Sequence, residues 1–204
     1  MIVIIDYGMG NLRSIQYKLA KQGINALISS EIDSIEQADK LILPGVGAFA
    51  AGMSNLEKMG ILPILHEVVL ERKTPFLGIC LGMQLLSKWS EEGDAKGLGW
   101  IDAETKKFNF DANINLPVPH VGWNTICKKK ECLLLNSVTE NQRFYFTHSY
   151  YVNCLNPEDI IATTDYGIQF VSIIQRQNIF GTQFHPEKSH RRGIDLILNF
   201  IRGA

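Results

Sequence analysis

The feature that most constrains this chain is a regular alternation of short apolar runs and helical patterns along its first half. Apolar runs typical of buried strands occupy residues 2–6, 26–28, 40–43 and 75–79. Apolar residues at helical spacing occupy residues 12–21, 48–59, 63–72 and 81–89. Strands that alternate with helices predict a parallel sheet that is covered by helices on both faces.

The second half changes character, because strand patterns follow one another with few helices between them. These strands are expected at residues 101–108, 144–147, 160–164, 169–175 and 179–184. A final amphipathic helix over 194–201 is expected to pack back onto the sheet. The length of 204 residues suits one domain with a substantial core. We therefore predict a single α/β domain over 1–204, with a largely parallel central sheet and an antiparallel extension.

Composition argues against several classes of protein. The chain carries 20 Lys and Arg against 21 Asp and Glu, and 46% of its residues are hydrophobic. This balance argues against disorder and against nucleic-acid binding, and the basic run Lys128-Lys129-Lys130 is interpreted as a solvated turn. No apolar stretch reaches the roughly 18 residues of a membrane helix. The first residues lack the basic leader of a signal peptide, so none is expected.

The cysteines of the chain, Cys80, Cys127, Cys132 and Cys154, include no C-x-x-C pair. A disulfide framework or a zinc site is therefore not expected. The sequence also lacks a Walker-type loop, a G-x-G-x-x-G motif and a cluster of metal-ligand residues, so we predict neither a cofactor nor a metal. The default expectation is a cytoplasmic enzyme with free thiols.

The sharpest local signal is Gly78-Ile79-Cys80-Leu81-Gly82, which joins an apolar strand to a helical pattern. This is the setting of a nucleophile elbow, with cysteine in place of serine. A tight turn strains the backbone of the nucleophile, and the flanking glycines leave room for the neighbouring strand and helix. The start of the helix favours a thiolate at Cys80. The alternative is a buried structural cysteine, but the paired glycines favour the nucleophile.

A thiol nucleophile needs a base, and the base needs an orienting group. The segment Phe184-His185-Pro186-Glu187 follows an apolar strand and offers both. Residues two apart in an extended chain face the same way, so we expect Glu187 to orient the ring of His185 toward the sulfur. The alternative is a surface histidine beside a surface glutamate. The other histidines lack so rigid a pairing in the sequence; they are His66, His120, His148 and His190.

The third element is the loop Leu43-Pro44-Gly45-Val46-Gly47, where the strand at 40–43 is expected to end. Its two glycines allow peptide N–H groups to turn toward an anion. Such a loop can supply half of an oxyanion hole, and the N–H of Leu81 can supply the other half. An ordinary turn at the end of a strand is an equally good interpretation of this segment alone.

Together these motifs resemble a known family. The segments 78–84 (GICLGMQ) and 183–187 (QFHPE) are similar to the class I, triad-type glutamine amidotransferases. The segments 5–12, 43–47, 119–124 and 185–189 narrow the resemblance to the glutaminase subunits of imidazole glycerol phosphate synthases. The resemblance runs from residue 4 to the final helix. The segment 190–192 departs from the family in being more basic than expected, near the presumed partner face. Two departures are mild: Val121 stands where many members carry Met, and Ser149 stands where some carry Thr.

The resemblance implies a reaction. The Cys80 thiolate would attack the side-chain amide carbon of glutamine, and backbone N–H groups at Val46 or Gly47 and at Leu81 would hold the oxyanion. His185, oriented by Glu187, would protonate the departing ammonia and then activate water to hydrolyse the thioester. The resemblance also implies a set of glutamine-binding residues, namely Gly47, Gln84, Glu92, Ser149 and Tyr150.

The resemblance further implies a heterodimer. A (β/α)8-barrel synthase would receive the ammonia and make imidazole glycerol phosphate and aminoimidazole carboxamide ribotide in histidine biosynthesis. Asn11 and Lys188 would lie at the subunit interface and take part in gating. For Lys188, a solvated lysine after a turn is the alternative.

Three other hypotheses stay open on the sequence alone. A paralogous glutaminase could deliver ammonia to a partner that amidinates a nucleotide-linked or surface-polysaccharide sugar. A non-catalytic protein on the same fold is disfavoured because Cys80, His185 and Glu187 are all present. A cysteine peptidase on a related fold is disfavoured because Gln84 and the loop at 43–47 suit an amide pocket better.

Overall fold

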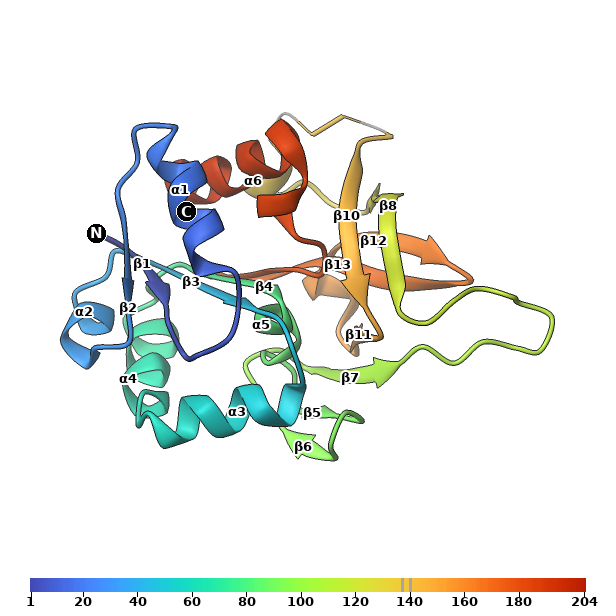
Figure 1. The fold of residues 1–204 in the computed structure, drawn as a ribbon, viewed down its shortest axis with the longest axis horizontal. Helices are drawn as coiled ribbons and strands as arrows, with labels where there is room; N and C mark the ends of the chain where they lie inside the picture. Colours follow the sequence, from blue (N-terminus) through green and yellow to red (C-terminus); the bar gives the residue numbers. More distant parts are fainter. Residues whose placement is uncertain (137, 140) are drawn as a thin grey trace.

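The fold is built on one large twisted sheet, seen here in a computed structural model that describes residues 1–136, 138–139 and 141–204 (Figure 1). Among these residues, eight strands form the sheet in the order β2-β1-β3-β4-β14-β13-β12-β9. The strands are β1 (Ile2–Ile5), β2 (Ala26–Ser29), β3 (Lys40–Gly45), β4 (Phe76–Cys80), β9 (Cys127–Lys128), β12 (Ile160–Tyr166), β13 (Ile168–Arg176) and β14 (Ile179–Thr182). The strands from β2 to β14 pair in parallel and those from β14 to β9 pair antiparallel. The predicted fold class is therefore confirmed.

The central parallel strands β1, β3, β4 and β14 are buried on both faces, because they are apolar at nearly every position. In β1, Val3 and Ile5 join the core on one face, and Ile4 joins the core on the other. The first core is covered by α2 (Ile32–Glu36), α3 (Phe49–Lys58), α4 (Leu62–His66) and the π-helical turn Glu67–Glu71. The second core is covered by α1 (Leu12–Ala20) and α6 (His190–Gly203). Figure 1 shows these two helix groups on opposite sides of the sheet.

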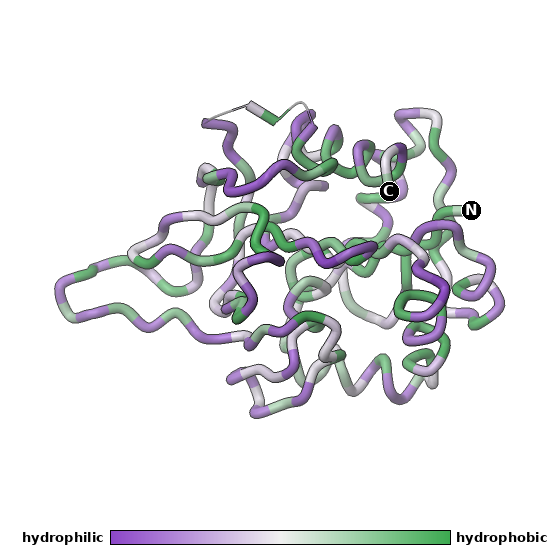
Figure 2. Tube along the Cα trace, turned by 180° about the vertical axis from the view of Figure 1, so that it is seen from behind, coloured by the Kyte–Doolittle hydropathy of each residue, from purple (hydrophilic) through white to green (hydrophobic). Residues whose placement is uncertain are grey.

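Smaller sheets extend the molecule beside the main one. Strand β10 (Arg143–His148) pairs antiparallel with β8 (His120–Thr125). A second small sheet has the order β11-β7-β5-β6 and contains β11 (Tyr150–Cys154), β7 (Ala103–Lys107), β5 (Trp89–Ser90) and β6 (Ala95–Lys96). The apolar segments in the centre of the chain trace and the polar segments at its loops are visible from behind in Figure 2.

Strand β8 was not predicted, because its burial pattern is the reverse of its hydropathy pattern. Its apolar residues Val121 and Trp123 are exposed, whereas the polar His120 is buried. Short 3-10 turns at Leu133–Leu135, Pro157–Asp159 and Pro186–Lys188 complete the described structure.

The predicted helix over 81–89 is wrong beyond its first turn. Helix α5 (Leu81–Gln84) ends early, and residues 89–90 form strand β5. The cause is competition for the backbone, since the carbonyls of Leu85, Leu86 and Ser87 accept hydrogen bonds from residues 97–101 instead of from a next helical turn. Gly97 makes this approach possible, because a Cβ there would lie 2.1 Å from the carbonyl oxygen of Ser87.

The prediction that Pro44-Gly45 ends a strand is also wrong, since β3 continues through both residues. Pro44 pairs with Ile79, and Gly45 pairs with Cys80. Strand β1 pairs with β3 only as far as Ile42. Pro44 therefore lies where β3 has one strand neighbour, a position that tolerates a residue without an N–H donor.

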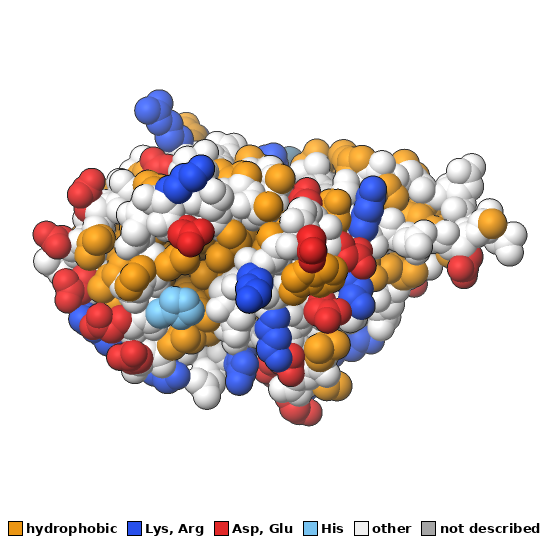
Figure 3. All heavy atoms as spheres, turned by 90° about the horizontal axis from the view of Figure 1, so that it is seen from below, with side chains coloured by type: hydrophobic (Ala, Val, Ile, Leu, Met, Phe, Trp, Pro, Cys, Tyr) orange, Lys and Arg blue, Asp and Glu red, His pale blue; other side chains and the backbone are white. Residues whose placement is uncertain are grey.

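The surface carries charges of both signs. On the face covered by α3, basic and acidic side chains are interspersed with apolar ones (Figure 3). Within the described residues, no helix has the length and apolar character needed to cross a membrane.

Candidate active site

The elbow predicted around Cys80 is formed by the end of β4 and the start of α5. Cys80 has φ +54° and ψ −108°, a strained backbone for a residue with a side chain. The residues two positions before and two positions after it must be glycine for steric reasons. A Cβ at Gly78 would lie 2.5 Å from the carbonyl oxygen of Gly82, and a Cβ at Gly82 would lie 1.8 Å from that of Leu43. The glycines therefore let the strands approach α5 closely enough to present the sulfur.

His185 and Glu187 form a buried pair. The Nδ1 atom of His185 lies 2.8 Å from Oε1 of Glu187, and the side chains are 1% and 2% exposed. The expected contact is present, but the expected route to it is wrong. Residues Pro186–Lys188 form a 3-10 turn, not an extended chain, and this turn brings the carboxylate back to the ring.

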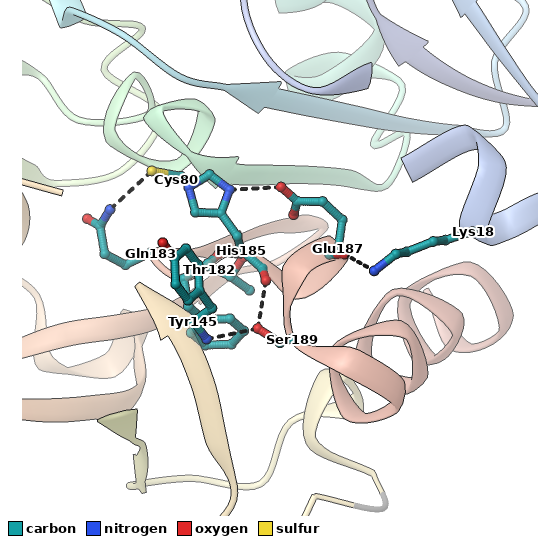
Figure 4. Close-up of polar contacts among 9 residues, drawn as sticks. Lys18, Cys80, Tyr145, Thr182, Gln183, His185, Glu187 and Ser189 are labelled. Carbon is teal, nitrogen blue, oxygen red and sulfur yellow. Dashed lines mark hydrogen bonds and ion pairs between the residues drawn. The ribbon is translucent and has the colours of Figure 1, made fainter. Parts of the chain in front are cut away.

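The backbone around this pair is held from several sides (Figure 4). Strand β10 contributes the carbonyl of Tyr145, which accepts from the N–H of His185 at 2.9 Å. The hydroxyl of Ser189 donates to the carbonyl of His185 at 2.6 Å and accepts from the N–H of Tyr145 at 2.9 Å. Lys18 of α1 donates to the carbonyl of Glu187. These contacts fix the imidazole relative to the sheet, so its position does not depend on Glu187 alone.

The other ring nitrogen of His185 is turned toward the sulfur of Cys80 (Figure 4). Among the described residues this Nε2 atom has no hydrogen-bond partner. Burial by itself lowers the pKa of His185, but the nearby Cys80 thiolate and the Glu187 carboxylate outweigh burial and raise the pKa above its ordinary value. The site therefore favours the imidazolium form of His185 beside the sulfur.

A pocket of about 500 Å³ opens over the sulfur. The structure brings together here nearly all of the residues that the resemblance singled out. The lining residues are Val46, Gly47, Cys80, Leu81, Gln84, Glu92, Pro119, Thr147, His148, Ser149, Tyr150 and Lys188.

Three predicted site residues do not line this pocket: His185 and Glu187 are buried beside Cys80, and Asn11 lies outside it. Asn11 is exposed at the start of α1. The loop before it packs on the loop at 43–47, since a Cβ at Gly10 would lie 2.9 Å from the carbonyl oxygen of Pro44. Met9 of the same loop abuts Gly47, which has φ +116°. Asn11 is therefore linked to the pocket through its neighbours in the chain.

Gln84 and Glu92 are anchored by their polar atoms. The side-chain nitrogen of Gln84 donates to the carbonyl of Tyr150 at 2.8 Å and to Oε1 of Gln183 at 3.2 Å. Oε2 of Glu92 accepts from the backbone N–H of Phe49 at 2.8 Å, at the start of α3. Anchored groups of this kind present one fixed acceptor each, rather than a mobile side chain, to whatever enters the pocket.

The structure adds Tyr7, which the sequence analysis did not single out. Its ring is fully buried after β1, and its hydroxyl has no hydrogen-bond partner among the described residues. Burial raises the pKa of Tyr7 and the nearby Cys80 raises it further. A Cβ at Gly45 would lie 2.2 Å from this hydroxyl. The segment 5–12 that carries part of the resemblance contains Tyr7, but no hydrophobic periodicity indicates that its phenol is buried.

The sequence offered the remaining histidines no rigid pairing, but the structure brings His120 and His148 together. Their rings are buried side by side, with Nδ1 of His120 at 3.2 Å from Nε2 of His148. His148 also lies 2.8 Å, through Nδ1, from the carbonyl of Tyr150. His120 stacks on Tyr166, with 3.9 Å between ring centroids. Burial lowers the pKa of His120 to about 4 and that of His148 to about 3, so both rings are neutral.

This pair predicts acid sensitivity. Below about pH 6.5 the unfolded chain binds protons at His120 and His148 that the folded chain does not bind, so stability falls as the pH drops toward 4. The slope is about 1.4 kcal/mol per pH unit for each histidine. In the His148→Gln variant, this slope should be smaller by the contribution of one histidine when the free energy of unfolding is measured in urea between pH 4.5 and 7. The control His190→Gln, at an exposed position, should leave it unchanged; equal slopes in both variants would contradict the assignment.

No cluster of three or more His, Cys, Asp or Glu side chains able to hold a metal ion is found within the described parts of the chain.

Comparison with known proteins settles the family. The family described as glutamine amidotransferase class-I matches residues 3–203. The chain belongs to the class-I glutamine amidotransferases. Curated members similar to it include imidazole glycerol phosphate synthase subunit HisH 2 of Methanococcus maripaludis, 50% identical over the full length of both chains. The protein of the same name from Pseudomonas aeruginosa is 47% identical over 98% of each chain.

Solved structures of more distant proteins share the fold. A crystal structure of a glutamine amidotransferase superposes with a TM-score of 0.74 over 98% of this chain and 99% of that chain, at 17% identity. The structure of PurLQS from Thermotoga maritima superposes with a TM-score of 0.71 over 98% of each chain, at 15% identity. The sheet and its covering helices thus persist at low sequence identity.

Proposed function

We propose that this chain is the glutaminase subunit of an imidazole glycerol phosphate synthase, which hydrolyses L-glutamine and passes the ammonia to a synthase subunit in histidine biosynthesis. The observation that carries the proposal is the meeting of Cys80, which lines the pocket, with the buried pair of His185 and Glu187. Full-length identity to HisH subunits supports the assignment of the pathway.

The reaction follows from this geometry in two steps. The Cys80 thiolate attacks the carboxamide carbon of glutamine, and the oxyanion that forms accepts hydrogen bonds from backbone N–H groups at Leu81 and at Val46 or Gly47. The imidazolium of His185 gives its proton to the amide nitrogen, so that ammonia leaves and a glutamyl thioester remains. His185 then takes a proton from water, which attacks the thioester and releases glutamate and the thiolate.

Each member of the triad has a distinct task. Glu187 holds the Nδ1–H tautomer of His185, which leaves Nε2 to exchange protons with the sulfur, the leaving ammonia and water. The buried carboxylate also stabilises the imidazolium. Burial of all three groups excludes bulk water from the proton transfers.

The amino-acid end of glutamine is recognised at the opposite side of the pocket. Its ammonium suits the anchored carboxylate of Glu92 and the fixed carbonyl oxygen of Gln84, both of which line the pocket. Its carboxylate suits the backbone N–H groups at Ser149 and Tyr150 on the rim. These roles complete the glutamine-binding set together with Gly47.

The partner in this proposal is a (β/α)8-barrel synthase, and the two chains form a heterodimer in the cytoplasm. The ring-forming lyase step belongs to that synthase. Lys188 lines the mouth of the pocket with its ammonium 5.8 Å from the ring centroid of Tyr145, a position suited to gating ammonia. Asn11, exposed beside the loop at 43–47, lies where a partner can act on the oxyanion site.

One observation favours keeping a second ammonia acceptor as an alternative. Methanococcus maripaludis has two HisH subunits, and this chain is 50% identical to HisH 2 and 44% identical to HisH 1. A duplicated glutaminase is free to serve another synthase, such as one that amidinates a sugar. Because acceptor chemistry resides on the partner, the site of this chain would be the same in either case.

The test is a glutaminase assay of the purified chain with and without a histidine-pathway barrel synthase and its ribulosyl phosphate ligand. We expect glutamate release to be slow alone and to rise by about 5- to 150-fold in the complex, the range of an ordinary coupling free energy between two sites. Stimulation without formation of imidazole glycerol phosphate would favour the sugar-linked acceptor. Full activity of the isolated chain would contradict the partner dependence.

A further inference from the structure

A series of buried amide and imidazole groups, joined by hydrogen bonds, leads to the catalytic sulfur, and its last residue meets the sulfur on the side away from His185 (Figure 4). This last residue is Gln183, which follows β14 and is fully buried. The side-chain nitrogen of Gln183 donates to the Sγ atom of Cys80 at 3.8 Å. Its backbone N–H donates to the carbonyl of Ser172 at 2.9 Å, which fixes the residue to β13. The sequence motif at 183–187 contained Gln183, but the triad mechanism gives it no task.

The orientation of this amide is set by its neighbours. A backbone carbonyl only accepts hydrogen bonds, so the atom of Gln84 at 2.8 Å from the oxygen of Tyr150 must be its nitrogen. That nitrogen has a second hydrogen, which goes to Gln183 at 3.2 Å, so the atom of Gln183 there must be its oxygen. The nitrogen of Gln183 is thereby left to face Cys80. The reverse orientation would place an oxygen against a sulfur anion.

The carbonyl of Tyr150 is in turn held from the other side by the histidine pair. Nδ1 of His148 must carry the hydrogen that this carbonyl accepts, so Nε2 of the neutral ring accepts from Nδ1 of His120. Nε2 of His120 then faces the side-chain nitrogen of Asn124 at 3.5 Å. Each hydrogen-bond donor in this series is thus assigned without conflict. The donors of Gln84 and His148 meet at the fixed carbonyl of Tyr150.

We propose that Gln183 is a further catalytic residue, which stabilises the Cys80 thiolate by donating a side-chain N–H to the sulfur. Gln84 acts as a positioning residue in the same proposal, because it fixes which end of the Gln183 amide meets the sulfur. The proposal deepens the proposed function and rests on Cys80 as the nucleophile. It gives the thiolate a second donor, beside the imidazolium of His185, before the attack on glutamine and again when hydrolysis of the thioester releases the sulfur.

The sulfur has other titratable neighbours, which the experiment holds constant. His185 faces it from beyond β14, and Tyr7 lies near it after β1. Glu92 and Lys188 line the rim of the same pocket. A change confined to Gln183 alters none of these groups.

The experiment measures the pH dependence of Cys80 alkylation by iodoacetamide in the full chain, resolved from the other cysteines by peptide mass spectrometry. Gln183→Met keeps the volume of the side chain and removes the donor. In this variant the pH midpoint of Cys80 alkylation should rise by about one pH unit, which corresponds to a tenfold loss of thiolate below the midpoint. Gln183→Glu is isosteric and should raise the midpoint further, because it puts a carboxylate against the sulfur. The control Gln175→Met removes a glutamine from the neighbouring strand β13 and should leave the midpoint unchanged.

A kinetic readout separates this role from a merely structural one. In the complex with the synthase, Gln183→Met should lower kcat/KM for glutamine about tenfold at pH 7, and the loss should shrink as the pH rises past the new midpoint. Folding is checked by circular dichroism, and Gln183→Glu serves if the Met variant does not fold. An unchanged alkylation midpoint in a folded Gln183 variant would overturn the proposal. Because alkylation reads the sulfur directly, this result is distinct from a failure to hydrolyse glutamine, which would overturn the proposed function.

Discussion

Replacing Cys80 by alanine is expected to lower glutamine hydrolysis by about 10⁴-fold or more while the chain stays folded. Removal of the nucleophile from a triad leaves only the rate that an oxyanion site and substrate binding can support. Cys80 is 6% exposed, and the change deletes one sulfur atom at the base of a pocket, so the core is little disturbed. The measurement is glutamate release by the complex with its synthase, with thermal unfolding recorded in parallel.

Matched variants of the other cysteines test whether this effect is specific. Cys127→Ala and Cys154→Ala remove thiols that lie outside the pocket and should keep full activity. A glutamine-mimicking electrophile should label Cys80 in preference to the other thiols. Activity of Cys80→Ala within tenfold of the parent, or labelling at another cysteine, would sink the assignment of the nucleophile.

Replacing Gly82 by alanine is expected to be the most damaging change to stability. The added Cβ would lie 1.8 Å from the carbonyl oxygen of Leu43, a backbone atom of β3 that cannot rotate away. Either α5 or β3 must shift, and both carry parts of the site. We expect a loss of about 3 kcal/mol or more in the free energy of unfolding, as in overpacked cores. The loss is read from urea unfolding, or from loss of soluble folded protein when the variant does not fold.

The control for this change is Gly203→Ala near the end of α6. A Cβ there would meet nothing closer than 3.7 Å, so alanine should be neutral or slightly stabilising. If Gly82→Ala and Gly203→Ala both unfold at the same urea concentration as the unsubstituted protein, the close approach of α5 to β3 is wrong. Loss of glutaminase activity at unchanged stability would show that the glycine serves the geometry of the elbow rather than its packing.

Much of the fold followed from the sequence because the parallel half of the sheet has strong local signals. Apolar runs between helical patterns specify buried strands, whichever partner each strand finds. The smaller sheets gave weaker signals. Strand β8 exposes Val121 and Trp123 and buries His120, and α5 is cut short by hydrogen bonds from residues 97–101. In β8 the burial of side chains opposes their hydropathy, and in α5 a distant segment competes for the backbone; local propensity registers neither effect.

By itself, the sequence determined the chemical identity of the site: a cysteine between two glycines after a strand, a histidine two residues before a glutamate, and the motifs of the class-I glutamine amidotransferases. Only the tertiary structure decided how these groups are oriented. The 3-10 turn brings Glu187 to His185, and the carbonyl of Tyr150 fixes the amides of Gln84 and Gln183. The physical reason is that a hydrogen bond depends on distance and direction between groups up to 103 residues apart. Residue order along the chain specifies neither quantity.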